Sequence, residues 1–371
     1  MSDKQIVDYT LEIPIKETKL PLANYVVENN GKSYPVEISS NIKGESCIIF
    51  PIGCIEPKQE LVFSIKEGTS ESYPKRTYAE LSHKIGGQFI GREYIGGYSW
   101  VKTNYMALPG SFTDHSYFIK YEGPGWENDK VAFRFYLDNR NAIDVFGKTT
   151  SDMVLPAVGV DGFDNYHNLT AWGMDNLKVG KALGLGTIAI WDGNKAVRVE
   201  KKDSTTCLIA ADGKLRSQVK TTYYGWAANS TKCNLTSLIT IDAGSRASHM
   251  ELFADKSIDN LATGIILDKS APLITGDKTG EWSYIATFGK QSMNKDMQGL
   301  AIFYRIKQLK QIAQDELNHV IVLNPDNGYA DYYFMPTWEL DKEPVKTKDQ
   351  IIECINKVLN RLNSNIQYTI K

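Results

Sequence analysis

The feature that most constrains the fold is a run of short strand-like segments that follow one another closely between residues 187 and 335. Two of the connections, Asp192-Gly193-Asn194 and Asp212-Gly213-Lys214, contain the Asp-Gly pair that favours tight β-hairpins. The expected strands cover 187–191, 196–200, 205–210, 217–226, 235–241, 249–253, 264–267, 283–288, 300–304, 320–323 and 331–335. Such spacing leaves no room for crossover helices, so it indicates a large antiparallel sandwich and not alternating β and α units.

Strand and helix patterns also indicate how the rest of the chain is divided into parts. Residues 1–75 are expected to form short strands, as a small lobe or as the first part of the sandwich, and residues 76–371 to form the main domain. Helices are expected near Trp172, over 306–317 and at the C-terminus. There Asp349 can cap a helix that docks on the sandwich through an apolar stripe of Ile351, Ile352, Ile355, Val358, Leu359 and Leu362. The expected fold class is therefore all-β with a few short helices.

Composition narrows the class of protein. With 371 residues, 42% of them hydrophobic, and a net charge of −2, the chain is typical of a globular protein and does not favour nucleic acid as a partner. The five cysteines are expected to be free, with a Cys47–Cys54 disulfide as the alternative. No apolar run is long enough to span a membrane. The N-terminus lacks a signal-peptide pattern, so we expect a periplasmic protein that has lost its leader, or a cytoplasmic one.

The stretch from His115 to His167 combines strand periodicity with reactive side chains. Residues 131–140 alternate, with Val131, Phe133, Phe135 and Leu137 on one face and Arg134, Tyr136, Asp138 and Arg140 on the other. The polar row is an unusual surface unless it binds a ligand; the alternative is a solvated strand face with an Arg–Asp cross-strand pair. The turn residues at 122–127 predict a hairpin between 116–121 and 131–137. A long connection then carries Asp161 and ends at His167.

Two kinds of chemistry suit the polar residues of this chain. One is acid/base work on a sugar acid, with an arginine pairing the carboxylate. The other is a metal site, which the wide separation of the histidines disfavours, so no metal or cofactor is expected. Tyr224 with Trp226 on one strand face could form a sugar platform, or both could simply pack in the sandwich. The further candidates are His115, His167, His249, Arg134, Arg140, Arg246, Glu127 and Tyr166.

Several motifs resemble a domain family of unknown function from bacterial polysaccharide-utilisation loci, a family that includes an ulvan oligosaccharide dehydratase. The resemblance covers about residues 76–338 and departs at Asn139, where many members have tryptophan. It implies a fold similar to the galactose-mutarotase super-sandwich. The motifs are Tyr121-Glu122-Gly123-Pro124-Gly125-Trp126-Glu127, Asp144-Val145-Phe146-Gly147-Lys148, Asp161-Gly162-Phe163-Asp164-Asn165-Tyr166-His167, Trp172-Gly173-Met174-Asp175, Lys178-Val179-Gly180 and Tyr223-Tyr224-Gly225-Trp226.

The resemblance implies a lyase that removes the 4-hydroxyl and the C5 proton from a non-reducing-end uronic acid. From the chemistry we expect Arg134 or Arg140 on the carboxylate, His167 or His115 as base, and Tyr166 or Tyr224 as acid. The other residues expected to bind substrate are Glu127, Trp126, Trp226, Arg246, His249 and Asp161. A polysaccharide lyase, a carbohydrate-binding protein and a mutarotase-like epimerase are the alternatives.

The site hypothesis makes one geometric prediction. His115, Arg134, Arg140, Tyr166 and His167 should converge on one cleft, with the loop at 161–167 folded over the Arg134 face of the strand.

Overall fold

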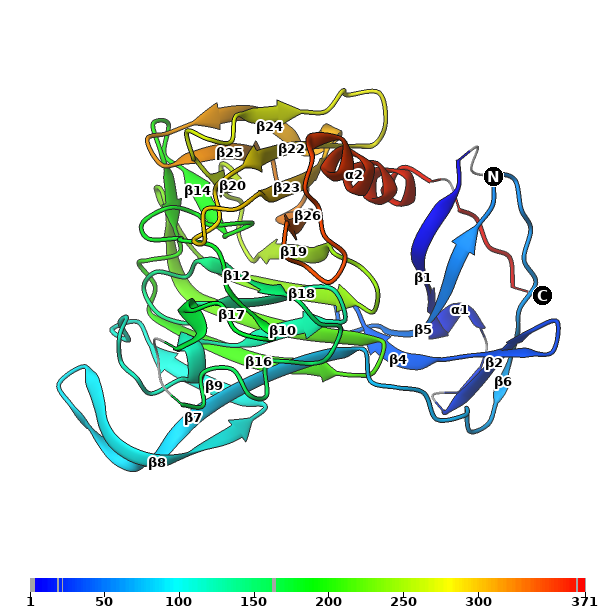
Figure 1. Ribbon diagram of the computed structural model, residues 1–371, viewed down its shortest axis with the longest axis horizontal. Helices are drawn as coiled ribbons and strands as arrows, with labels where there is room; N and C mark the ends of the chain where they lie inside the picture. The colour runs from blue at the N-terminus through cyan, green and yellow to red at the C-terminus, as the bar shows by residue number, and fades with distance from the viewer. Residues whose placement is uncertain (1–3, 19, 22, 162–164, 365, 371) are drawn as a thin grey trace.

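Antiparallel strands dominate the computed structural model, which describes residues 4–18, 20–21, 23–161, 165–364 and 366–370. Every pairing between its named strands is antiparallel. The all-β sandwich expected from the strand spacing is confirmed (Figure 1).

The largest sheet, called here the large sheet, has nine strands. In spatial order they are β21 (Leu273–Thr275), β22 (Trp282–Gly289), β23 (Gln298–Arg305), β26 (Tyr329–Trp338), β19 (Ser248–Ala254), β18 (Thr231–Asp242), β17 (Arg216–Ala228), β16 (Ser204–Asp212) and β9 (Tyr105–Pro109). The turn at 213–215 joins β16 to β17, where the Asp-Gly signal predicted a hairpin.

A second sheet, called the hairpin sheet, has six strands and carries the candidate site. Its order is β13 (Gly173–Asp175), β12 (Ile143–Lys148), β11 (Ala132–Phe135), β10 (Gly125–Asn128), β7 (Thr77–Ile90) and β8 (Glu93–Thr103). A smaller sheet of five strands completes the main body: β15 (Ala196–Arg198), β14 (Ala189–Trp191), β20 (Leu261–Ile266), β25 (Asn318–Leu323) and β24 (Leu309–Gln314).

The core lies between the hairpin sheet and the large sheet. Trp126 and Phe133 stack with ring centroids 5.3 Å apart, and Phe133 meets Phe334 of the large sheet edge to face at 5.4 Å. Phe135 and Leu137 lie in the same core, so the apolar half of the predicted alternation is confirmed. Because the core occupies the inner faces, each sheet has an outer face on the opposite side of the sandwich.

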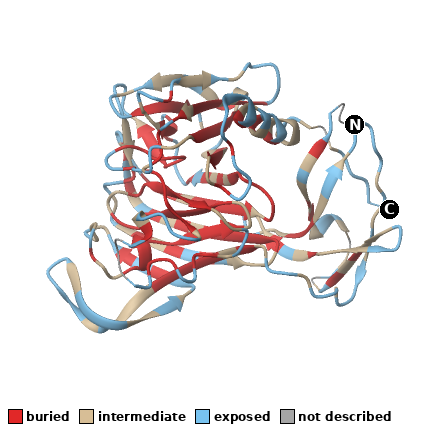
Figure 2. Cartoon of the chain, viewed as in Figure 1, coloured by how far each residue is buried: buried red, intermediate tan, exposed pale blue. Residues whose placement is uncertain are grey.

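The hairpin of β7 and β8 extends beyond the body of the protein, and its tip is exposed (Figures 1 and 2). The hairpin predicted between 116–121 and 131–137 is wrong. Residues 125–128, taken as part of a turn, are strand β10, which pairs with both β11 and β7. The long connection expected after Asp144 starts later, because β12 continues to Lys148.

The N-terminal part forms two sheets of three strands each, which lie at the right of Figure 1. They are β1 (Ile6–Pro14), β5 (Ser46–Ile55) and β4 (Glu37–Ser40), and β3 (Lys32–Tyr34), β2 (Tyr25–Asn29) and β6 (Ser64–Glu67). Helix α1 (Ile15–Thr18) follows β1, and an apolar cluster around Val27, Ile48 and Phe50 holds these elements together. The boundary near residue 75 stays a prediction.

Helices are fewer than expected. Helix α2 (Lys348–Leu362) is confirmed, and Ile351, Ile355 and Val358 pack on the outer face of the large sheet. Its N-cap is Thr347 and not Asp349, since the Thr347 hydroxyl accepts from the Gln350 amide in a capping box. The other two predictions are wrong: the Trp172 region leads into β13, and 306–317 contains the short 3-10 helix η3 (Ile306–Gln308) followed by β24.

The cysteines are free, as expected. Among the described residues, no helix is long and apolar enough to cross a membrane.

Candidate functional site

A row of side chains crosses the outer face of the hairpin sheet. Strand register places Glu80 of β7 beside Gly125, Gly125 beside Arg134 of β11, and Arg134 beside Asp144 of β12. Residues paired directly across antiparallel strands point to the same face. The Arg134–Asp144 cross-strand pair is therefore real, but the face is covered and not solvated, because both side chains are 1% exposed.

Gly125 makes room in this row for the side chain of Tyr121. A Cβ atom at Gly125 would lie 2.7 Å from the Tyr121 hydroxyl, so a larger residue would push the ring off the sheet. The Tyr121 hydroxyl donates to Glu80 Oε1 at 2.8 Å, and the Tyr121 carbonyl accepts from Arg134 Nη1 at 3.3 Å. Tyr121 therefore connects the β7 end of the row to Arg134.

All the N–H groups of Arg134 are used inside the protein. Nε and Nη2 donate to Asp144 Oδ2 at 3.3 and 2.9 Å, and Nη2 also donates to Asp175 Oδ2 at 2.7 Å. Nη1 donates to the Tyr166 hydroxyl at 2.8 Å as well as to the Tyr121 carbonyl. The expected contact between Arg134 and a substrate carboxylate is wrong, since this guanidinium is enclosed and saturated. Arg134 positions Asp175 and Tyr166 instead.

The carboxylates around Arg134 outnumber its single positive charge. Asp144 and Asp175 bind the same guanidinium, and Glu122 Oε2 lies 3.7 Å from Nη1. Burial and the neighbouring Asp175 raise the pKa of Asp144 to about 7, although Arg134 acts in the opposite direction. A further positive charge beside this cluster is therefore stabilised.

His167, at the end of the 3-10 helix η2 (Asn165–His167), is the group that can supply this charge. Its Nδ1 lies 3.1 Å from Asp175 Oδ2, and 35% of its side chain is exposed. The contact has the distance of an ion pair without hydrogen-bond alignment, and Asp175 Oδ1 has no hydrogen-bond partner among the described residues. Asp175 raises the pKa of His167 against the effect of partial burial. Asp175 therefore favours the protonated form of this imidazole.

Tyr166 lies next to His167 and keeps its proton. The two ring centroids are 4.7 Å apart, and the Tyr166 hydroxyl accepts from Arg134. Burial raises the pKa of Tyr166 to about 12, although Arg134 lowers it in part. A neutral phenol at this position is a proton donor.

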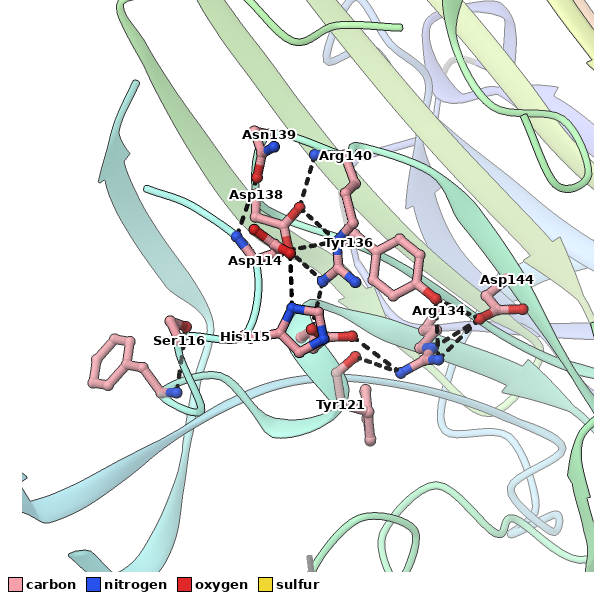
Figure 3. A network of polar contacts seen from close by, with 12 residues as sticks. Asp114, His115, Ser116, Tyr121, Arg134, Tyr136, Asp138, Asn139, Arg140 and Asp144 are labelled. Carbon is pink, nitrogen blue, oxygen red and sulfur yellow. Dashed lines mark hydrogen bonds and ion pairs between the residues drawn. The ribbon is translucent and has the colours of Figure 1, made fainter. Parts of the chain in front are cut away.

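Arg140 lies beside the same cluster with spare hydrogen-bonding capacity. The Tyr136 ring separates its guanidinium from that of Arg134 (Figure 3). Arg140 Nε and Nη2 bind Asp138, and Nη2 also binds Glu122. Its Nη1 donates to none of the described residues, and 17% of the side chain is exposed. Arg140 rather than Arg134 can therefore pair with an incoming carboxylate.

His115 and Asp114 form the rim beside Arg140 (Figure 3). His115 Nδ1 lies 2.7 Å from Asp114 Oδ2, and half of the His115 side chain is exposed. Burial raises the pKa of Asp114, but His115 and Arg140 together bring it below its usual value. A second histidine–carboxylate pair thus lies close to Arg140 (Figure 3).

The backbone leading to this rim is strained. His115, Tyr117, Tyr121 and Glu122 have φ values of 54°, 56°, 37° and 70°. Non-glycine residues in this left-handed region cost on the order of 1–3 kcal/mol each and concentrate at functional sites. The strain in 115–122 singles out the segment that carries His115 and contacts Arg134.

Contacts link several of the residues predicted to converge, whereas the cleft itself stays a prediction. Arg134 and His167 lie on the same side of the hairpin sheet because both contact Asp175. Contacts link Arg140 to Glu122, Glu122 to Arg134, Arg134 to both Tyr166 and Asp175, and Asp175 to His167. His115 is paired with Asp114, on which Arg140 acts electrostatically. Residues 162–164 of the covering loop lie outside the described residues; Asp161 binds the Asn165 amide at 2.8 Å.

Four of the expected substrate-binding residues are structural. Trp126 and Glu127 are fully buried; Trp126 donates to Ser248, and Glu127 binds Lys148 at 2.7 Å. Trp226 is 1% exposed in the core, and Arg246 is paired with Asp341 at 2.7 Å. Their expected contact with substrate is wrong, because all four side chains are enclosed and Trp126, Glu127 and Arg246 are bound to partners inside the protein.

Tyr224 and His249 are on the wrong side of the molecule for this site. Both belong to the large sheet, and Tyr223 and Met250 beside them point into the core, so Tyr224 and His249 point away from it. Tyr224 and Trp226 do not share a face, because a bulge with Gly225 at φ 61° shifts the alternation. The assignments of Tyr224 as acid and His249 as binding residue are wrong for one shared site.

The sequence analysis missed Asp175, Asp144 and Glu122 as members of the network. All three lie in the quoted motifs, but a sequence motif does not show which carboxylates contact the same guanidinium in the folded protein. It also missed a groove of about 790 Å³ along β7 and β8. Its lining includes Tyr94, Tyr98, Trp100, Lys84, Tyr117 and Asp161. Among the residues described, no group of three or more His, Cys, Asp or Glu side chains could hold a metal ion.

These features define an all-β sandwich with a buried arginine–carboxylate network and two nearby histidines whose side chains are partly exposed. The family model described as "Domain of unknown function (DUF4861)" matches residues 2–367, so the chain belongs to this family. The match includes the N-terminal and C-terminal parts that lie outside the resemblance seen from the motifs.

Among its relatives is "Uncharacterized protein P7" from Formosa agariphila, which is 27% identical over an alignment of 278 residues that covers 66% of this chain and 66% of that protein. Two solved structures from Enterococcus faecalis are similar to this chain, a protein in glycosyl hydrolase family 38 and an α-mannosidase. Each has 8% sequence identity and a TM-score of 0.42, and the similarity covers 97% and 100% of this chain. The chain spans less than half of those two proteins, 45% and 46%.

Proposed function

We propose that this protein is a carbon–oxygen lyase that removes water from the non-reducing-end uronic acid of an oligosaccharide. A base takes the C5 proton, the C4–O bond breaks, and an acid protonates the departing hydroxyl. The products are water and a 4,5-unsaturated uronate whose double bond is conjugated with the carboxylate. The reaction is balanced by proton transfer alone and needs no redox partner.

One observation carries the proposal: an imidazole, a protonated phenol and a guanidinium with an unused N–H belong to one network at one opening. Elimination next to a carboxylate requires these three functions, because the carboxylate must be neutralised before its α-proton becomes acidic. His167 is the base, oriented by Asp175, and Tyr166 is the acid, held by Arg134. Arg140 pairs with the carboxylate through its free Nη1. His115 is the alternative base.

The placement of base and acid supports a particular stereochemistry. Since the His167 and Tyr166 rings are neighbours at 4.7 Å, both approach the sugar from one side. The proton and the hydroxyl then leave from the same face of the ring. Glucuronate has its C5 proton and 4-hydroxyl on the same face, whereas galacturonate has them on opposite faces. We therefore propose glucuronate-terminated oligosaccharides as substrates.

The test is a screen of defined oligosaccharides ending in glucuronate or galacturonate, including fragments of ulvan. Mass spectrometry reads the loss of one water, and ultraviolet absorbance reads the conjugated double bond. We expect both signals with glucuronate ends. Chain cleavage with the same absorbance would make the protein a polysaccharide lyase. Binding without any absorbance would overturn the lyase proposal in favour of a carbohydrate-binding protein.

A further inference from the structure

The groove along the β7–β8 hairpin is a second feature of the same outer face. Its floor includes Tyr78, Glu80, Ser82 and Lys84, the residues of β7 that alternate with core residues such as Leu81. Glu80 is shared between the groove and the network, since it accepts from the Tyr121 hydroxyl. Tyr117, whose ring centroid lies 6.4 Å from that of His115, lines the groove at its inner end. The groove therefore leads away from the rim of the candidate site.

Tyr98 is an aromatic surface built into this groove. Its side chain is 83% exposed. The ring lies flat against the backbone of Gly86, where an added Cβ would come within 2.0 Å of it. Gly86 also has φ 83°, a backbone conformation that residues with a Cβ rarely adopt. Both the close Tyr98 ring and this conformation therefore exclude other residues at position 86. On the opposite strand Gly96 faces Gly87, and the Tyr94 hydroxyl accepts from the Gly87 amide at 3.0 Å. The missing side chain at Gly86 therefore leaves room for an exposed ring close to the backbone, where its outer face is available for stacking.

Trp100 and Lys84 add a second ring and a cation. The Trp100 indole donates to the Val160 carbonyl at 3.3 Å, and Lys84 Nζ lies 5.2 Å from the centre of the Trp100 ring. Among the described residues Lys84 has no carboxylate partner, whereas the other lysines of the lining are paired: Lys102 with Asp212 and Lys120 with Glu80.

We propose that the groove binds the part of an anionic oligosaccharide that follows the terminal uronate, with Tyr98 and Trp100 stacked on sugar rings. Lys84 binds a sulfate or carboxylate group of that chain. Stacking platforms beside an unpaired cation suit an anionic sugar better than a neutral one. Asp161, the carboxylate of the lining without a lysine partner, lies on the covering loop, where it binds the Asn165 amide. This inference rests on the proposed function for the position of the terminal uronate, but not for the binding itself.

The test measures binding calorimetrically with ulvan, oligogalacturonate and heparin tetrasaccharides and with neutral cellotetraose. We expect Tyr98→Ala, Trp100→Ala and Lys84→Ala each to weaken anionic binding by up to roughly tenfold, the order expected for one stacking or cation contact. The control is Tyr105→Ala, because Tyr105 is 56% exposed on β9 and lies outside the groove. It should leave binding unchanged.

The outcomes separate this inference from the proposed lyase activity. If the wild type never produces the double bond but the groove variants lose anionic binding, the groove stands and the lyase proposal fails. If the wild type is active and the variants keep wild-type affinity and KM for a tetrasaccharide, the groove inference is overturned. Equal affinity for cellotetraose, or no binding of any anionic tetrasaccharide, would overturn it as well.

Discussion

The outer faces of the two main sheets each carry a histidine held by an aspartate that is held by an arginine. On the hairpin sheet the set is His167, Asp175 and Arg134; on the large sheet it is His249, Asp331 and Arg305. The histidine–aspartate distance is 3.1 Å in both. The arginine–aspartate distances, 2.7 and 2.6 Å, are also nearly equal. The distances alone therefore do not distinguish the two sets, although His249 is hydrogen-bonded to Asp331 and His167 is not aligned for a hydrogen bond to Asp175.

The difference lies in the surroundings. Burial raises the pKa of Asp331, but its partners His249 and Arg305 together bring it below its usual value. The His249 ring is stacked on Tyr333 at 4.1 Å with an interplanar angle of 7°, so its position is fixed by packing. Around Arg134, in contrast, carboxylates are in excess and Asp144 has a pKa raised to about 7. An excess of buried negative charge keeps a proton exchangeable, whereas a balanced pair does not.

The backbone conformation also differs between the two faces. His249, Asp331 and Arg305 lie within regular strands β19, β26 and β23. The hairpin-sheet network instead meets the segment 115–122, where non-glycine residues have positive φ. Strain and unbalanced charge coincide at one of the two faces, and we locate the chemistry there.

The largest expected effect separates the two histidines by activity. His167→Ala should lower kcat by about 10²–10⁴, the usual cost of losing a general base. His249→Ala should change kcat by less than about threefold, because it lies on the far face and loses only packing. The measurement is the ultraviolet absorbance of the unsaturated product. If His167→Ala retains more than about a tenth of wild-type kcat, the base must be sought at His115.

The two arginines should separate by stability. Arg134→Met leaves two buried carboxylates without their cation, and breaking a buried pair in this way costs about 3–5 kcal/mol. Arg305 is 25% exposed and Asp331 keeps His249 as a second partner, so Arg305→Met should cost less than Arg134→Met. Urea unfolding at neutral pH measures both values. Similar losses for the two variants would show that the Arg134 network is no more costly to break than the partly exposed Arg305–Asp331 pair.

The sequence was sufficient to predict those structural features that depend on a local pattern of residues. Alternation at 131–137 predicted the core face of β11. The Arg–Asp pair on its other side belonged to the alternative interpretation, which placed it on a solvated face and not a buried one. The C-terminal stripe predicted the docking of α2. These succeed because periodicity is a property of neighbouring residues.

The remainder depends on contacts between distant segments. In the sequence Gly125 resembles a turn residue, but it lies in a strand. A glycine is needed there because the Tyr121 side chain occupies the space that a Cβ would take. Simple alternation places Tyr224 and Trp226 on the same face of the strand, but the bulge at Gly225 puts them on different faces. An alternation pattern does not reveal such a bulge. Asp175 joins Arg134 and His167 only because β13 pairs with β12. Burial of both faces of β11 likewise follows from the covering loop, so the polar row could not be recognised as enclosed.

A smaller effect tests Arg140 as the carboxylate ligand. Arg140→Lys keeps the charge but loses the planar fork that binds Glu122 and Asp138 while leaving Nη1 free. We expect KM to rise and kcat to fall together, by about tenfold in kcat/KM, since the contact strengthens as charge moves onto the carboxylate. Arg246→Lys, at an arginine enclosed elsewhere, is the matched control and should leave both constants near wild type. Unchanged kinetics in Arg140→Lys would remove Arg140 from substrate binding.

The smallest effect is a shift in pH dependence, and it tests whether Asp175 acts through His167. Asp175 favours the protonated imidazole and so raises the pKa of His167. The base must be neutral, so kcat/KM should rise with pH through that raised pKa. In Asp175→Asn this stabilisation is lost while Arg134 still lowers the pKa, and the inflection should move to lower pH. The neutral side chain is tolerated because Asp144 still pairs with Arg134. Asp331→Asn should leave the inflection in place. If Asp175 has only a structural role, Asp175→Asn should lower kcat/KM at every pH without moving the inflection. That result would show that Asp175 does not act through His167.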